Sequence, residues 1–422
     1  MELLRFCTVG SVDDGKSTLI GRLLFDSKAI FEDTWDAIER TSQARGEEYV
    51  NLALITDGLR AEREQGITID VAYRYFATPR RKFIIADTPG HVQYTRNMVT
   101  GASTADLALI LVDVRQGVVE QSRRHAFLSS LLGIPHLVVC VNKMDMAGYD
   151  QAAYEAVRAD FQPFLERLDF KQVTFIPISA LKGDNVVDRS TEMPWYDGPA
   201  LLQHLEEVEV PPPGDLEAPR FPVQYVIRPM REDFHDYRGY AGTVAGGVFH
   251  PGDVVTVLPT GHRTHIEAID TFDGPVTAAC APMSVTIRLA DDVDISRGNM
   301  IVAGVAGTRG PSIGNEFEAW VCWMSERGRL LPGGRYALKH TTHNVRAVVQ
   351  SVDARLEINT LAEDLSPDGL SLNEIGRVRF KTTEPLYFDA YQRNRTTGSF
   401  ILIDEATNDT LAAGMILGAI PA

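Results

Sequence analysis

Residues Gly10 to Ser17 fit the pattern G-x-x-x-x-G-K-S between an apolar run, Leu3 to Val9, and a helical pattern, Ser17 to Phe25. The glycines of such a loop let backbone N–H groups surround a phosphate, and the helix adds the positive end of its dipole. Lys16 would reach the β- and γ-phosphates, and the Ser17 hydroxyl would hold Mg²⁺. The predicted phosphate-binding residues are Gly10, Ser11, Val12, Asp13, Asp14, Gly15, Lys16, Ser17 and Thr18.

A second motif, Asp87-Thr88-Pro89-Gly90-His91, follows the apolar run Lys82 to Ala86. A carboxylate at a strand end beside a phosphate-binding loop can hold Mg²⁺ through a water, and the glycine lets its N–H approach the γ-phosphate. A lone histidine after a turn is usually a solvated residue. Its place directly after this motif instead predicts that His91 orients an attacking water.

A long polar connection, residues 26–65, precedes Gly66-Ile67-Thr68. A connection of this length is either a functional lid or a disordered linker. Because it ends in a threonine, we interpret it as a switch in which Thr68 offers its hydroxyl to Mg²⁺ and its N–H to a γ-phosphate. Thr68 alone equally fits an ordinary strand position. The predicted metal ligands are Ser17, Thr68 and Asp87.

The motif Asn142-Lys143-Met144-Asp145 indicates which base is bound. The Asp145 carboxylate can accept hydrogen bonds from N1–H and the 2-amino group of guanine. Adenine would leave that carboxylate unpaired. Asn142 would brace neighbouring loops, and the Lys143 stem would pack on the ring plane. Backbone N–H groups at Ser179 and Ala180 would donate to guanine O6, so we expect GTP with Mg²⁺.

The elements that must position these motifs are apolar strands alternating with amphipathic helices over residues 1–210. This alternation predicts an α/β P-loop GTPase domain with a mainly parallel sheet. Ligands bind beyond the carboxyl ends of such strands, where the motifs stand. The predicted strands are Leu4 to Val9, Ile67 to Phe76, Lys82 to Ala86, Leu107 to Val112, His136 to Val141 and Val173 to Ile178.

The second half of the chain changes character after a Glu- and Pro-rich run at residues 206–219. Short alternating strands with Gly, Pro, Asp and Asn turns follow, and they predict two antiparallel β-barrels. We therefore expect a GTP-binding domain at 1–210, one barrel at 220–306 and another at 314–422. The first barrel includes a predicted strand from Gly242 to Phe249. The second half contains no further P-loop, so we expect no fused kinase.

The composition limits the classes of partner. A net charge of −16 disfavours non-specific binding to nucleic acid or an anionic membrane. The four cysteines form no C-x-x-C pair, no apolar run reaches membrane-spanning length, and the chain enters a strand almost at once. We expect a cytoplasmic protein. The basic run Arg377 to Lys381 is more simply a solvated strand face than a nucleic-acid site.

The phosphate loop, the segment Asp57 to Thr68, the segment Asp87 to Met98 and Asn142 to Asp145 together resemble the elongation-factor-Tu-like, translation-factor class of GTPases. Elongation factors usually carry G-H-V-D-H-G-K, whereas this chain has Ser11 and Asp14 in place of the histidines. In this loop and in the segment Asn394 to Asp404, the chain is most similar to the GTPase subunits of assimilatory sulfate adenylyltransferase.

That resemblance implies a G domain followed by two β-barrels, with His91 orienting the attacking water. It also implies that GTP hydrolysis drives a partner subunit, an ATP-pyrophosphatase-like protein that forms adenosine 5'-phosphosulfate and pyrophosphate from ATP and sulfate. The alternative is a translation elongation factor that delivers aminoacyl-tRNA. Ser11 and Asp14 favour the sulfate enzyme over this alternative.

Overall fold

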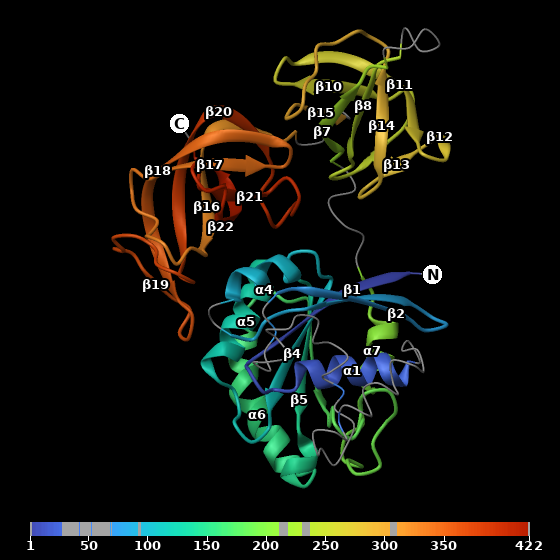
Figure 1. Ribbon diagram of the computed structural model, residues 1–422, viewed down its shortest axis with the longest axis vertical. Coiled ribbons are helices and arrows are strands. Elements are labelled where there is room, and N and C mark those ends of the chain that lie inside the picture. The colour runs from blue at the N-terminus through green and yellow to red at the C-terminus, as the bar shows by residue number, and fades with distance from the viewer. Residues whose placement is uncertain are drawn as a thin grey trace. The chain divides into compact units, whose positions relative to one another are not determined.

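The computed structural model describes residues 2–27, 42, 52, 68, 70–91, 94–210, 218–229, 237–303 and 310–420. The chain divides into two compact units, residues 1–210 with 358–360, and residues 211–357 with 361–422. The first unit is an α/β domain, and the second contains two β-barrels (Figure 1). This arrangement confirms the predicted fold class.

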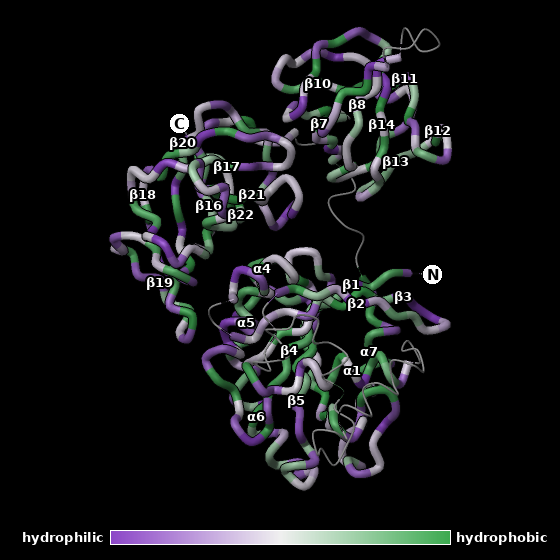
Figure 2. Tube along the Cα trace, in the orientation of Figure 1, coloured by the Kyte–Doolittle hydropathy of each residue, from purple (hydrophilic) through white to green (hydrophobic). Residues whose placement is uncertain are grey.

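A six-stranded sheet in the order β2-β3-β1-β4-β5-β6 forms the centre of the first unit. Every neighbouring pair is parallel except β2–β3. The central strand β4 is buried along its whole length, and Figure 2 shows its hydrophobic character; this is expected where helices cover both faces of a parallel sheet. The strands are β1 (Leu3–Gly10), β2 (Ala72–Ala77), β3 (Lys82–Asp87), β4 (Leu107–Asp113), β5 (His136–Asn142) and β6 (Gln172–Pro177).

Helices cover both faces of this sheet. Figure 1 shows α4, α5 and α6 on one side and α1 and α7 on the other. Leu19, Ile20 and Leu23 of α1 join the buried core under β1 and β3, which anchors the helix that follows the phosphate loop. The helices are α1 (Lys16–Asp26), α4 (Thr95–Ala102), α5 (Glu120–Leu131), the 3₁₀ helix η3 (Met144–Ala147), α6 (Gln151–Leu165) and α7 (Leu201–Glu207). No helix in the described part of the chain is long and apolar enough to span a membrane.

The first barrel closes in the order β10-β15-β7-β8-β14-β11, with β11 pairing back to β10. Its pairs are antiparallel, and closure leaves none of these six strands at a sheet edge. The strands are β7 (Arg220–Ile227), β8 (Gly239–Thr243), β10 (Val254–Leu258), β11 (His262–Thr271), β14 (Ser284–Leu289) and β15 (Met300–Ala303). Shorter strands lie beside them: β9 (Val248–Phe249), β12 (Gly274–Val276) and β13 (Ala279–Cys280).

The second barrel closes in the order β17-β21-β22-β16-β20-β18, with β18 pairing back to β17. Phe317, Phe380 and Phe400 meet in its core with ring centroids 5.4 to 5.5 Å apart. The strands are β16 (Ser312–Trp323), β17 (Arg335–His340), β18 (His343–Glu357), β19 (Ala362–Asp364), β20 (Ile375–Phe388), β21 (Ser399–Ile403) and β22 (Thr410–Ala419).

A buried ion pair joins the two barrels. Arg220, the first residue of β7, and Asp389, just after β20, make contacts of 3.0 and 3.1 Å, and their side chains are only 1% and 4% exposed. The hydroxyl of Thr397 donates to the same carboxylate at 2.7 Å. A side-chain amide from the second barrel, Asn394, donates to the Ala245 carbonyl of the first. A small buried cluster, Leu258, Met300, Val302 and Tyr387, adds apolar packing between the same two barrels.

Two predicted strands were wrong in their extent. The strand predicted from Ile67 begins at Ala72, because Asp70 forms a bend in which its carboxylate accepts the Val71 N–H; a side chain that bonds nearby backbone competes with a strand ladder. Ile67 itself lies outside the described residues. The strand predicted at Gly242 to Phe249 is split into β8 and β9, because Gly247 takes a φ of +64°, which interrupts an extended strand.

Candidate nucleotide site

The phosphate loop joins β1 to α1, as its sequence pattern requires. Lys16, the first residue of α1, donates from Nζ to the carbonyls of Gly10 at 3.0 Å and Ser11 at 2.7 Å. Burial lowers the pKa of Lys16, and the nearby Asp87 and Asp14 carboxylates oppose this shift. Within the described part of the chain no side chain caps α1, so its first N–H groups point into the loop as anion donors.

The Asp14 side chain makes a hydrogen bond within the phosphate loop. Its carboxylate is buried and accepts the Ser11 N–H at 2.6 Å. Burial raises the pKa of Asp14, while the Lys16 ammonium and the Ser11 hydrogen bond lower it. The sequence singled out Ser11 and Asp14 as unusual residue types but did not predict that they contact each other.

The end of β3 packs directly against this loop. Parallel register places Asp87 opposite Thr8 of β1, and the Thr8 hydroxyl donates to Asp87 at 3.3 Å. Gly90 approaches the loop so closely that a methyl group in place of its hydrogen would lie 2.3 Å from Lys16 Nζ and 2.5 Å from the Gly10 carbonyl oxygen. Only glycine fits there, and its backbone therefore lies against Lys16, the residue predicted to reach the β- and γ-phosphates.

The burial of His91 and of the predicted magnesium ligands can be compared with their predicted roles. His91 is half-buried, and its ring centroid lies 6.0 Å from that of Tyr94. Asp87 is buried and Ser17 is half-buried in the first turn of α1. A carboxylate and a hydroxyl are hard oxygen donors, so these two residues fit Mg²⁺. Thr68 is half-buried, but the rest of the switch segment from Asp57 lies outside the described residues.

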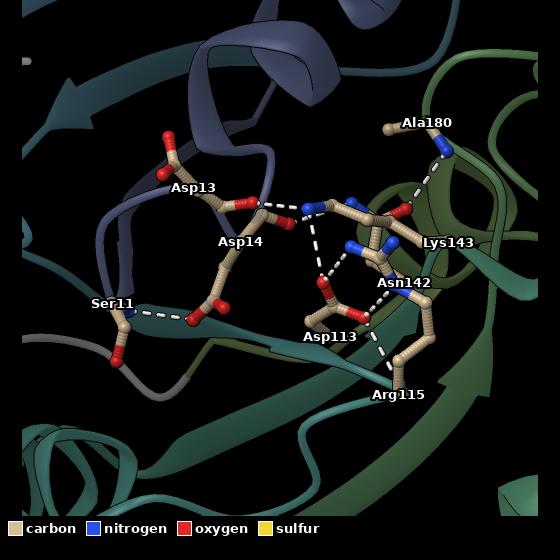
Figure 3. Close-up of polar contacts among 8 residues, drawn as sticks. All are labelled: Ser11, Asp13, Asp14, Asp113, Arg115, Asn142, Lys143 and Ala180. Carbon is tan, nitrogen blue, oxygen red and sulfur yellow. Dashed lines mark hydrogen bonds and ion pairs between the residues drawn. The ribbon is translucent and has the colours of Figure 1, made fainter. Parts of the chain in front are cut away.

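On the base side, Asn142 spans two loops. Its Nδ2 donates to the Asp14 carbonyl at 2.7 Å, and its Oδ1 accepts the Ala180 N–H at 2.9 Å. These are the bracing contacts that the sequence predicts for Asn142. Figure 3 shows the residue between the phosphate loop and Ala180.

Asp145 is oriented by a contact that sequence reasoning missed. The Ser179 hydroxyl donates to Asp145 at 2.7 Å. The N–H groups predicted to donate to guanine O6 already have protein acceptors, since Ser179 N–H donates to the Asp184 carbonyl at 3.1 Å and Ala180 N–H to Asn142. A base oxygen would have to share or replace these acceptors. The Ser179 side chain therefore contacts the predicted base-binding carboxylate, whereas its backbone N–H is used by a protein acceptor.

A second missed residue, Asp113, lies at the carboxyl end of β4. It contacts Lys143 at 3.0 Å and Arg115 at 2.6 Å (Figure 3). Its position at a strand end of the sheet was a usable signal, because the predicted motifs stand at equivalent ends.

The remaining predicted residues divide by exposure: Thr88, Pro89, Met144 and Ala180 are buried, Val12 and Thr18 are half-buried, and Asp13 is exposed.

Comparison with known proteins agrees with this geometry. Residues 1–216 match the family "Elongation factor Tu GTP binding domain", and residues 316–417 match "GTP-eEF1A C-terminal domain-like". The chain is 52% identical over 421 residues to sulfate adenylyltransferase subunit 1 of Alteromonas mediterranea, a match that covers 99% of this chain and 88% of that relative. The chain belongs to the sulfate adenylyltransferase subunit 1 family.

Two further relatives fall in the same group. Sulfate adenylyltransferase subunit 1 of Bacteroides fragilis is 51% identical over 418 residues, covering 99% of this chain and 86% of the relative. The bifunctional enzyme CysN/CysC of Mycobacterium tuberculosis is 62% identical over 416 residues, covering 98% of this chain and 67% of the relative. The words "subunit 1" in the family name imply a partner subunit.

Proposed function

We propose that this chain is the GTPase subunit of a sulfate adenylyltransferase, in which GTP hydrolysis drives synthesis of adenosine 5'-phosphosulfate and pyrophosphate from ATP and sulfate on a partner subunit. The observation that carries the GTPase part is the meeting of three motifs at one edge of the sheet. Gly90 packs on Lys16, and Asn142 bonds the backbone of Asp14. The names of the relatives support the sulfate part.

In this proposal the phosphates of GTP lie in the nest before α1. Lys16 would exchange its two loop carbonyls for phosphate oxygens, and the Gly90 N–H would face the γ-phosphate. Ser17, Asp87 and Thr68 would hold Mg²⁺, which would neutralise charge on the β- and γ-phosphates. Asp145, oriented by Ser179, would accept the two guanine donors.

His91 is the residue proposed to orient the attacking water. It directly follows Gly90, which packs against Lys16, and this neighbourhood supports a role at the γ-phosphate end of the site. A half-buried imidazole there can hold a water by a hydrogen bond and restrict its approach. Positioning of this kind accounts for much of the catalysis in phosphoryl transfer.

The partner is proposed to be an ATP-pyrophosphatase-like subunit that holds the adenylyl-transfer site. We place the pair in the cytoplasm because the cysteines are free thiols and three of them are buried. Burial raises the pKa of both Cys7 and Cys140 to about 12. Such thiols behave as small apolar residues of a reducing compartment.

The test is reconstitution of the purified chain with that partner, ATP and sulfate, with and without GTP. GTP should raise the formation of adenosine 5'-phosphosulfate, and the complex should hydrolyse GTP faster than the chain alone. Replacing GTP by a non-hydrolysable analogue is the control, because it fills the site without releasing free energy. The sulfate proposal fails if GTP changes neither rate, and GTP-dependent protection of charged tRNA would point to translation instead.

A further inference from the structure

We propose that Asp113 is a positioning residue that holds Lys143 between the phosphate loop and the base site. The inference rests on the proposed guanine site at Asn142 to Asp145. Asp113 is absent from the recognised nucleotide-binding motifs of the chain. Its effect on the nucleotide would pass entirely through the Lys143 ammonium.

Sheet register brings the two residues together. β4 and β5 are parallel, and Asp113 is opposite Asn142, the residue before Lys143. The Asp113 side chain is fully buried and lies 3.0 Å from Lys143 Nζ. The same ammonium donates to the carbonyl of Asp13 in the phosphate loop. Figure 3 shows Lys143 reaching both acceptors, so its side chain is held at the tip and cannot swing freely.

The backbone at Lys143 is held separately by main-chain contacts. Its φ is +64°, in the left-handed region that non-glycine residues seldom adopt. Such a conformation persists where surrounding contacts over-determine it. Here the Met144 N–H donates to the Ile178 carbonyl at 3.2 Å and the Met146 N–H to the Lys143 carbonyl at 2.9 Å, so the side chain starts from a fixed point and its direction is left to the contacts of the ammonium.

Arg115 fixes the carboxylate itself. Its guanidinium donates to both oxygens of Asp113, at 3.0 and 2.6 Å, and its backbone N–H donates at 3.0 Å. Burial raises the pKa of Asp113, but hydrogen bonds from Arg115 and Lys143 outweigh it and hold the pKa at about 2. Asp113 is therefore a fixed negative charge near neutral pH, and it presents a constant acceptor to Lys143.

The experiment is the release rate of a fluorescent GDP analogue from full-length Asp113→Asn. Asparagine keeps the volume of the side chain but removes the charge that holds the ammonium. We expect release about tenfold faster, because a hydrogen bond between charged groups is lost. The rate of GTP hydrolysis at saturating GTP should stay within about twofold, since Lys143 contacts no reacting atom. Asp106→Asn is the matched control; Asp106 lies just before the same strand and bonds the Arg5 N–H.

Lys143→Met distinguishes an effect of Asp113 through Lys143 from an effect of Asp113 on the fold alone. This variant keeps an apolar stem and removes the ammonium. Lys143→Met should itself release the analogue about tenfold faster, and adding Asp113→Asn should cause no further change. The inference would be overturned if the increases in release rate caused by the two substitutions multiplied in the double variant. It would also be overturned if either single variant released the analogue at the wild-type rate. If Asp113→Asn fails to fold, wild-type release from Lys143→Met still overturns it. A wild-type chain that does not prefer GDP to ADP would instead refute the proposed function.

Discussion

His91 and Asp145 depend on their neighbours in different ways. Asp145 belongs to the motif predicted to bind the base and contacts the Ser179 hydroxyl, whereas His91 directly follows Gly90, which packs against Lys16 of the phosphate loop. Binding of the base and positioning of the water should therefore respond separately to substitution. A side chain that only orients water contributes to the transition state and little to ground-state affinity.

His91→Ala tests this separation. We expect the variant to bind GTP within about twofold of the wild type and to hydrolyse it at least about tenfold more slowly. Single-turnover hydrolysis and equilibrium titration with GTP measure the two quantities. His250→Ala is a matched control, because His250 is an exposed histidine in the first barrel. Unchanged turnover in His91→Ala would remove His91 from the mechanism.

At the scale of elements, polar contacts between strands add to the apolar packing that joins them. Thr8 joins β1 to Asp87 after parallel pairing has set their register. Arg220 and Asp389 join two barrels that have separate main cores but share a small apolar cluster, Leu258, Met300, Val302 and Tyr387. A buried ion pair adds little stability over an apolar pair of the same shape. Removing one partner, however, leaves the other charge buried and uncompensated.

Arg220→Leu should therefore destabilise the second unit by about 3–5 kcal/mol, because the Asp389 carboxylate would stay buried without its cation. Hydrogen exchange of amides in β7 and β20 under urea would report the loss. Arg263→Leu, an exposed position in β11, should change little. The double variant Arg220→Leu/Asp389→Leu should recover part of the stability. A single variant as stable as the wild type would show that the pair contributes nothing.

At the scale of the whole molecule, the nucleotide site and the core beneath it lie in one continuous part of the chain. The core cluster of the first unit runs from Leu4 to Val208, and the Asp14–Asn142 and Ser179–Asp145 contacts lie within that range. None of these site contacts needs a barrel residue. Binding and partner coupling should therefore be separable.

A fragment of residues 1–210 should fold and bind GTP with an affinity within about tenfold of the full chain. Circular dichroism and calorimetric titration would measure folding and affinity. The complementary fragment, residues 211–422, should fold without binding GTP. An unfolded 1–210 fragment would show that the barrels are needed for the stability of the first unit. The fragment should fail to stimulate the partner if the barrels take part in coupling.

The sequence by itself determined the fold class and the motifs, because helical and strand periodicity and the phosphate loop are local patterns. It placed Gly10, Asp87 and Asn142 at strand ends, and parallel pairing brings those ends together. Two strand extents were wrong, because the bend at Asp70 and the positive φ of Gly247 interrupt the extended chain without interrupting the apolar pattern. The roles of His91 and Thr68 stay predictions.

Only the tertiary structure decided which polar groups meet across the sheet. Asp113 lies 30 residues before Lys143, the Ser179–Asp145 contact spans 34 residues, and the Arg220–Asp389 pair spans 169. A periodic pattern carries no information on such pairs, because each depends on the register of strands and on which loops fold over them. The sequence therefore determined the chemistry available to the nucleotide site, and the three-dimensional packing decided which side chains hold that chemistry in place.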